Sequence, residues 1–249
     1  MFVWLTVVLL LTGLYLYWAI RFDPAEALGV AIPATWLFPA WVLLPFFYSP
    51  NSIVATGLDV KVAVTSICLI LYCFIPGRRF PVKFVLSDYA MLTLFVVHHC
   101  SDALNDEWKW TVPARACAEW YLPYIAGRVC LQSARTIRRL WAYWAAIGIV
   151  LGLAAIIEGV TRVNPFELVF GVRPYEGASH DHVRWGLRRA YGVTLNPIYF
   201  GSIQVLLLGW IAYAAFRSLK KEIHWVWAFA PAVALLGIIC TGSRGPIFG

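Results

Sequence analysis

The residues best suited to chemistry lie close together, within residues 184–201. This stretch holds Arg184, Arg188 and Arg189, followed by Asn196 where a long apolar run begins. A guanidinium group presents a planar fork of N–H donors that binds phosphate in bidentate fashion, and it keeps its charge in a poorly hydrated site. The stretch therefore predicts a site for an anionic group, with these four side chains as its contacts.

The surrounding polar connection, residues 158–195, contains five arginines and no lysine. The two beyond the stretch above are Arg162 and Arg173, and we include Arg173 among the expected substrate contacts. Two interpretations remain open. The arginines hold an anionic ligand, or they pair with lipid headgroups and with acids of the same connection. Those acids are Glu158, Glu167, Glu176 and Asp181.

A second candidate element, Thr241-Gly-Ser-Arg-Gly-Pro246, follows the last apolar run. The glycines on both sides of Ser243 and Arg244 let the backbone approach a ligand closely and adopt unusual dihedral angles. An arginine at that depth is costly unless it faces a polar cavity or a partner. Arg244 on the same face as Arg189 would form a two-pronged clamp for a diphosphate, with Ser243 as a further contact. The alternative is an arginine that extends to the lipid headgroups.

Metal chemistry has little support in the sequence. The His180-Asp181-His182 and His98-His99-Cys100 groups lack the spacing of a further ligand, so surface histidines are the simpler interpretation. We find no P-loop, paired CxxC, GxGxxG or Ser-His-Asp pattern. The sequence predicts no metal and no cofactor.

The composition is that of a membrane protein. Apolar residues make up 61% of the chain and charged residues 13%, against about 45–50% and about 25% in soluble domains. The 13 Trp and 12 Tyr are typical of bilayer interfaces. The net charge of +7 therefore has to be assigned to sides of a membrane and does not indicate nucleic acid. Cys100 and Cys117 flank one polar loop and could pair in an oxidising compartment.

Apolar runs predict an all-α polytopic protein with a single transmembrane domain, residues 1–249. We expect about eight spans, with a long outer loop at 158–195 between the sixth and the seventh. The prolines of the second run predict a kink, and the fifth run is the weakest and could be re-entrant. The expected spans are 2–20, 30–48, 62–76, 84–99, 116–131, 140–157, 196–216 and 225–241.

Basic residues predict which side of the membrane each loop faces. The short loops 77–83, 132–139 and 217–224 are rich in Lys and Arg, which places them in the cytoplasm and 158–195 outside. Asp88, about one turn inside the fourth run, is expected to pair with Lys83 at the interface and not to relay protons.

Within the outer loop, residues 164–171 have the pattern of a short amphipathic helix. Asn164 is its expected N-cap and Pro165 its first residue.

Three motifs point to a family. They are Arg189-Ala-Tyr-Gly192, Asn196-Pro-Ile-Tyr-Phe-Gly201 and Ser243-Arg-Gly245. With weaker similarity at Pro123–Arg128 and Glu158–Phe166, residues 117–249 resemble the O-antigen ligase-like membrane proteins, a superfamily that includes Wzy-type polysaccharide polymerases.

The resemblance implies an inverting, metal-independent glycosyltransferase of the bacterial inner membrane. A glycan would pass, on the periplasmic face, from undecaprenyl pyrophosphate to a glycan, lipid A-core or protein acceptor. Arg189 and Arg244 match the family's arginines and would be the catalytic residues that neutralise the departing pyrophosphate.

The chain also departs from the family pattern. Family members continue through several more spans and a periplasmic loop with a histidine proposed to activate the acceptor. The chain ends four residues after Gly245, so we expect an N-terminal portion that lacks this base and is inactive by itself. His180 and His182 precede the Ser-Arg-Gly motif and do not match that histidine.

Two other functions remain open. A transporter or flippase for an anionic or lipid-linked substrate would place ionisable residues near span centres and would show two related halves. Neither feature is visible, which favours the enzyme. A structural membrane subunit would leave the arginine-only loop without a purpose.

Overall fold

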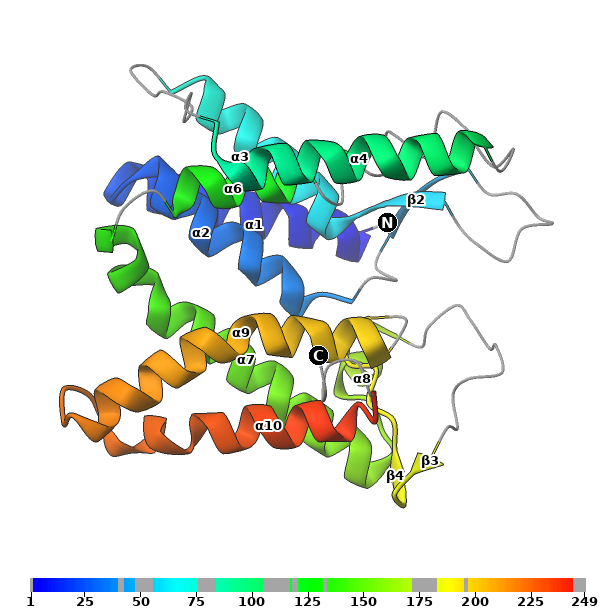
Figure 1. Ribbon diagram of the computed structural model, residues 1–249, viewed down its shortest axis with the longest axis vertical. Coiled ribbons are helices and arrows are strands. Elements are labelled where there is room, and N and C mark those ends of the chain that lie inside the picture. The colour runs from blue at the N-terminus through cyan, green and yellow to red at the C-terminus, as the bar shows by residue number, and fades with distance from the viewer. Residues whose placement is uncertain are drawn as a thin grey trace. The chain divides into compact units, whose positions relative to one another are not determined.

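The computed structural model describes residues 2–39, 43–47, 56–75, 84–104, 117, 121–131, 134–171, 183–194 and 197–243 (Figure 1). The described residues are mostly helical. The chain divides into two compact units. Unit 1 comprises residues 1–7, 33–60 and 137–249, and unit 2 comprises residues 8–32 and 61–136.

Three helices in the described part of the chain are long and apolar enough to cross a membrane: α1 (Phe2–Arg21), α7 (Ala134–Thr161) and α9 (Pro197–Leu219). They coincide with the runs expected at 2–20, 140–157 and 196–216. A helical membrane protein is thereby supported. The helix α3 (Val60–Cys73) and the segment Trp225–Cys240 are also apolar but shorter. The further spans stay a prediction.

The expected second span, residues 30–48, is not a single helix. Helix α2 (Pro24–Ala34) is followed by a 3₁₀ turn, η1 (Thr35–Leu37), and then by strand β1 (Leu43–Phe47). Strand β1 pairs antiparallel with β2 (Thr56–Asp59), with Pro45 opposite Gly57 and an irregularity beyond it. Pro33 is tolerated within the end of α2, whereas Pro39 follows η1 and Pro45 lies in β1. Because proline has no N–H donor and disfavours helical geometry in the residue before it, the helix does not continue through this run, where we expected only a kink.

One boundary also differs from expectation. Helix α7 begins at Ala134, so the basic residues expected in the 132–139 loop form its first turns. Arginine is a good helix former, so the basic residues are compatible with the first turns of a helix. The helix has 28 residues and is about 42 Å long, so it extends beyond a hydrocarbon core of about 30 Å. In the run at 116–131 the structure describes helix α6 over Leu122–Cys130, nine residues.

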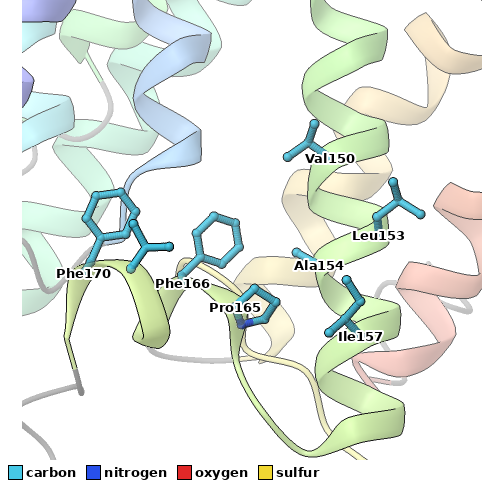
Figure 2. A pocket seen from close by; sticks show the side chains of 8 residues that line it. Val150, Leu153, Ala154, Ile157, Pro165, Phe166 and Phe170 are labelled. Atoms are coloured by element: carbon cyan, nitrogen blue, oxygen red, sulfur yellow. The ribbon is translucent and has the colours of Figure 1, made fainter.

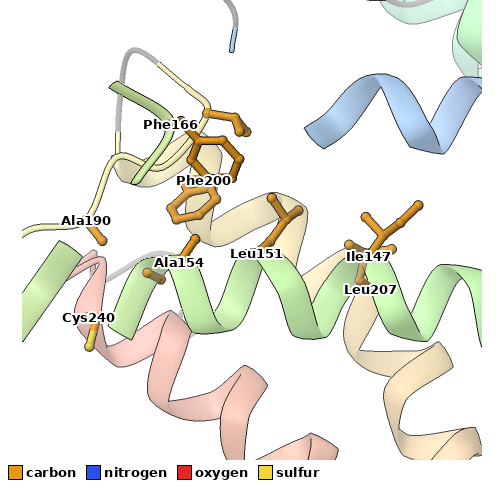
Figure 3. Packing of buried hydrophobic residues seen from close by; sticks show 10 residues of the cluster. Ile147, Leu151, Ala154, Phe166, Ala190, Phe200, Leu207 and Cys240 are labelled. Carbon is orange, nitrogen blue, oxygen red and sulfur yellow. The ribbon is translucent and has the colours of Figure 1, made fainter. Parts of the chain in front are cut away.

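The core of unit 1 is formed by α7, α9 and α10 (Ala230–Cys240), the last preceded by the 3₁₀ helix η3 (Trp225–Phe229). Two buried clusters follow one another along these helices. The first includes Leu151, Ala154, Phe166, Ala190, Phe200, Leu207 and Cys240 (Figure 3). The second includes Trp141, Ala145, Ile211, Ala214, Ala230 and Ala234. Residue numbers rise along α7 as they fall along α9, so these two helices are antiparallel. Ala190 brings the polar loop into the first cluster, which anchors that loop to the bundle.

The short helix predicted at residues 164–171 is confirmed. Helix α8 spans Pro165–Phe170, and the Asn164 side chain accepts a hydrogen bond from the Phe166 N–H at 2.8 Å. Pro165 occupies its first turn, where no N–H is needed. Phe166 is buried, whereas Leu168 and Val169 are exposed.

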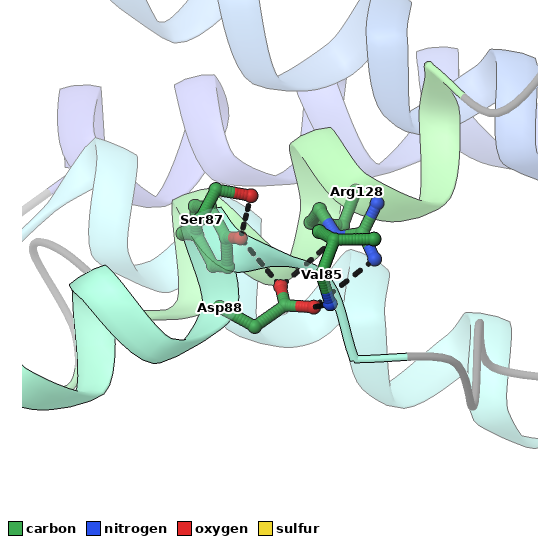
Figure 4. Close-up of polar contacts among 5 residues, drawn as sticks. Val85, Ser87, Asp88 and Arg128 are labelled. Atoms are coloured by element: carbon green, nitrogen blue, oxygen red, sulfur yellow. Dashed lines mark hydrogen bonds and ion pairs between the residues drawn. The ribbon is translucent and has the colours of Figure 1, made fainter.

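In unit 2, Asp88 ties helix α4 (Leu86–Leu104) to α6 (Figure 4). Its carboxylate accepts hydrogen bonds from Arg128 at 3.0 and 3.1 Å and from the Tyr124 hydroxyl at 2.5 Å. The partner seen in the structure is thus Arg128, whereas we expected Lys83, which lies outside the described residues. Asp88 is in the first turn of α4, consistent with an interfacial pair. The thiols of Cys100 and Cys117 are exposed and not bonded to each other.

Candidate functional site

A β-hairpin carries the first of the predicted arginines. Strands β3 (Val183–Arg184) and β4 (Leu187–Arg188) pair antiparallel, with Arg184 opposite Leu187. The two residues of the turn, Trp185 and Gly186, both have positive φ, at 54° and 78°. Such a turn matches the twist of short paired strands, and a tryptophan in this conformation is uncommon.

Three helices hold the loop that follows the hairpin. The Ala190 N–H donates to the Cys240 carbonyl at the end of α10, at 2.9 Å. The Tyr191 and Gly192 N–H groups donate to the same carboxylate oxygen of Glu158, near the end of α7, at 3.1 and 2.8 Å. The Gly192 carbonyl accepts from the Asn164 side chain, the cap of α8, at 2.8 Å. The backbone of residues 190–192 is therefore held by one main-chain bond to α10 and by the side chains of Glu158 and Asn164.

Glycine is required at position 192. Its φ is 53°, and a Cβ there would overlap the ring of Phe200 in α9. The Phe200 ring is fully buried and belongs to the cluster beneath the loop (Figure 3). The motif that pointed to a family thus has a local structural reason for its last residue.

The structure brings together three of the predicted site residues, Arg184, Arg189 and Ser243, at the C-terminal end of α10. The Arg184 guanidinium donates to the Gly242 carbonyl at 2.8 Å. The Arg189 guanidinium donates to the Thr241 carbonyl at 3.2 Å and to the Ser243 hydroxyl at 3.1 Å. The carbonyls at the end of a helix lack partners and carry partial negative charge, which accounts for cations at this position.

Gly242 allows the arginines to lie against this helix end. Its φ is 57°, and a Cβ would meet the Arg189 Cγ at 3.1 Å and the Arg184 Cδ at 3.4 Å. The unusual dihedral angle expected beside Ser243 is thus present at Gly242. Gly245 lies outside the described residues.

The part of the chain that the structure describes provides no acid that pairs with these two arginines. The guanidinium groups of Arg184 and Arg189 contact carbonyl and hydroxyl oxygens. Each guanidinium has five N–H donors, of which Arg184 uses one and Arg189 two in these bonds. Partial burial lowers the pKa of Arg189, and the neighbouring charge of Arg184 lowers it further. As far as the described residues go, the pair is an electropositive site whose guanidinium groups have N–H donors that these bonds do not use.

The other predicted residues fall into two groups. Arg188 donates to the Arg162 carbonyl just beyond the end of α7, and this contact does not join it to the Arg184–Arg189 pair. Arg173, Asn196 and Arg244 lie outside the described residues, as do His180 and His182. The proposed clamp of Arg189 with Arg244 therefore stays a prediction. Over the residues that the structure describes, no group of three or more metal-binding side chains occurs.

An apolar pocket lies between α7 and α8, close along the chain to the residues that hold the loop (Figure 2). Its volume is about 350 Å³, and every lining side chain is apolar. On α7 the lining ends at Ile157, next to Glu158, and on α8 it begins at Pro165, next to Asn164. Its apolar lining can accept a hydrocarbon chain.

Sequence reasoning overlooked the residues that hold the loop. Glu158 was considered as an ion-pair partner for arginines and Asn164 as a helix cap, but both also bind the backbone of the Arg189–Gly192 motif. The hairpin was missed as well. Its signal is the two-residue loop ending in Gly186 between Val183-Arg184 and Leu187-Arg188.

The chain matches no protein-family model, no curated protein and no solved structure. The family resemblance therefore rests on the sequence motifs.

Proposed function

We propose that the protein binds a glycan linked to undecaprenyl pyrophosphate and serves as a glycan ligase or polymerase on the periplasmic face of the bacterial inner membrane. The observation that carries this proposal is the Arg184–Arg189 pair, which contacts main-chain carbonyls and, within the described residues, no carboxylate. Two adjacent cations of this kind favour a ligand with two or more negative charges. A pyrophosphate has that charge, and guanidinium groups bind it in bidentate fashion.

The apolar pocket gives further support. A lipid-linked substrate needs a cationic site and a hydrocarbon surface within reach of each other, and the pocket between α7 and α8 adjoins the residues that hold the Arg189 loop. In the proposal, Arg189 and Arg244 stabilise the negative charge that develops on the departing pyrophosphate. Arg184, Arg188, Arg173, Asn196 and Ser243 bind the substrate, and a glycan or lipid acceptor completes the reaction.

In the proposed finer topology, the apolar runs other than the interrupted one at 30–48 span the membrane, residues 158–195 form the outer loop, and the basic segments 77–83, 132–139 and 217–224 lie in the cytoplasm. This orientation places the arginine pair on the face where lipid-linked glycans are transferred. No metal, cofactor or nucleic acid takes part in the proposed reaction.

Two measurements test the proposal: binding of the lipid pyrophosphate and transfer of the glycan. The purified chain in nanodiscs should bind undecaprenyl pyrophosphate at least about tenfold more tightly than undecaprenol, measured by native mass spectrometry. Arg189→Lys and Arg244→Lys should each remove most of this preference and abolish glycan transfer in a version that contains the acceptor-activating base. Arg217→Lys, at the other end of α9, is the matched control and should change neither.

Equal affinity of the unmodified chain for the two lipids would refute the proposal. So would full transfer by either arginine variant. Movement of a fluorescent lipid pyrophosphate across proteoliposomes, without transfer, would instead identify a flippase.

A further inference from the structure

Glu158 lies fully buried near the end of α7, under the loop that carries Arg189. A buried carboxylate is costly unless it is well hydrogen-bonded. One of its oxygens, Oε2, accepts from the Tyr191 N–H at 3.1 Å and from the Gly192 N–H at 2.8 Å. Two successive N–H groups that converge on one carboxylate oxygen form the arrangement of an anion-binding nest.

This nest controls the backbone next to Arg189, because only Ala190 separates Arg189 from Tyr191. The Ala190 N–H is itself bound to the Cys240 carbonyl at 2.9 Å. The backbone after Arg189 is thus held between the ends of α7 and α10. These helices lie in close contact here, since a Cβ on Gly159 would meet the Cys240 Cβ and Sγ at 3.1 Å.

We infer that Glu158 is a positioning residue, whose carboxylate fixes the Arg189 loop so that the guanidinium meets the pyrophosphate. Glu158 is fully buried and acts through Arg189 without touching the ligand. Because the Glu158 carboxylate already accepts from these two N–H groups, the guanidinium groups are the donors that bind the pyrophosphate oxygens. The inference rests on the proposed function and adds a residue that the anion site requires.

Paired lipid affinities test this role. In nanodiscs, Glu158→Ala should weaken binding of undecaprenyl pyrophosphate by about tenfold or more and leave binding of undecaprenol unchanged, because only the headgroup contact depends on Arg189. Glu158→Gln should be intermediate, since its amide oxygen still accepts hydrogen bonds without the charge. The double variant Glu158→Ala/Arg189→Ala should bind no more weakly than Arg189→Ala alone.

Glu222→Gln is the matched control. Glu222 is an acid that pairs with Arg217 at the opposite end of α9, and its variant should bind both lipids like the unmodified chain.

The results distinguish failure of the proposed function from failure of the positioning role of Glu158. If the unmodified chain shows no preference for the pyrophosphate, the proposed function fails and the positioning role fails with it. If that preference exists but Glu158→Ala retains it, or if the losses of the two single variants add, only the positioning role is overturned.

If Glu158→Ala does not fold, Glu158→Gln decides the question. Two quantities are then measured on this variant: hydrogen exchange at the Tyr191 and Gly192 amides, and affinity for undecaprenyl pyrophosphate. Faster exchange with weakened binding supports the inference. Exchange and binding like those of the unmodified chain overturn it.

Discussion

At the scale of single residues, the candidate site depends on glycines as much as on arginines. Gly242 gives the stems of Arg184 and Arg189 room against the end of α10, and Gly192 lets the loop pass over the Phe200 ring. Both have positive φ, so both the space and the dihedral angle exclude a larger residue. The arginines can act as a pair only because these two positions carry no side chain.

Gly192→Ala should therefore destabilise the protein strongly. Its Cβ would overlap the Phe200 ring, and an L-residue at φ 53° is strained. Overpacking and strain together predict a loss of about 2 kcal/mol or more, which corresponds to a fall in Tm of about 4–8 °C for a chain of this size. Thermal unfolding of the purified protein in detergent measures this loss.

Gly209→Ala is the control for that experiment. Gly209 lies in α9, is exposed, and has no neighbour within 4 Å of an added Cβ. Alanine there should leave Tm unchanged or raise it slightly, because alanine favours a helix more than glycine does. Equal effects at the two positions would contradict the steric argument for Gly192.

At the scale of elements, Asn164 connects helix α8 to the arginine loop. Its side-chain oxygen caps α8 by accepting from the Phe166 N–H, and its amide nitrogen donates to the Gly192 carbonyl. Asn164→Ala removes both bonds from a buried position, with an expected loss of about 2 kcal/mol. Chemical or thermal unfolding checks this value.

Asn164→Asp distinguishes the two bonds. An aspartate caps the helix equally well, but it cannot donate to the Gly192 carbonyl. We expect this variant to retain α8 and to loosen the loop, seen as faster hydrogen exchange over residues 189–194 with the exchange of 165–170 unchanged. Slow exchange in both segments would show that the Asn164–Gly192 bond is not needed to hold the loop.

Local patterns in the sequence identified some elements correctly. The cap and first turn of α8 follow from Asn164-Pro165, and the apolar runs locate α1, α7 and α9. These features depend on residues near one another in the chain, where helix capping and hydrophobicity act.

Features made by distant residues could not be predicted in this way. Asp88 pairs with Arg128, 40 residues away, although Lys83 was the nearer basic residue. The arginines were singled out by residue type and spacing, but their contact with the end of α10 joins segments more than 50 residues apart. The interrupted helix at 30–48 shows a different limit, since hydrophobicity alone does not reveal how far three prolines disrupt a helix.

At the scale of the molecule, the antiparallel pair α7 and α9 has basic residues at both ends. Arg217 stacks over Trp141 at 5.2 Å and pairs with Glu222, which joins the start of α7 to the end of α9. The Arg184–Arg189 pair marks the other end of unit 1. Because α9 is 23 residues long, about 34 Å, it is able to separate these two ends by the thickness of a bilayer.

Labelling of single cysteines in intact cells tests this separation and its direction. Trp185 and Glu222 have exposed side chains near opposite ends of unit 1, and the exposed native thiols at positions 73, 100 and 117 can be replaced by serine. Lysine and arginine are retained in short cytoplasmic turns, so the turn at 217–224 should lie inside and the hairpin outside. A membrane-impermeant maleimide should therefore label Trp185→Cys in intact cells and Glu222→Cys only after lysis.

Labelling of both before lysis would mean that α9 does not cross the membrane. The reverse pattern would place the arginine pair in the cytoplasm, where no periplasmic glycan transfer can occur.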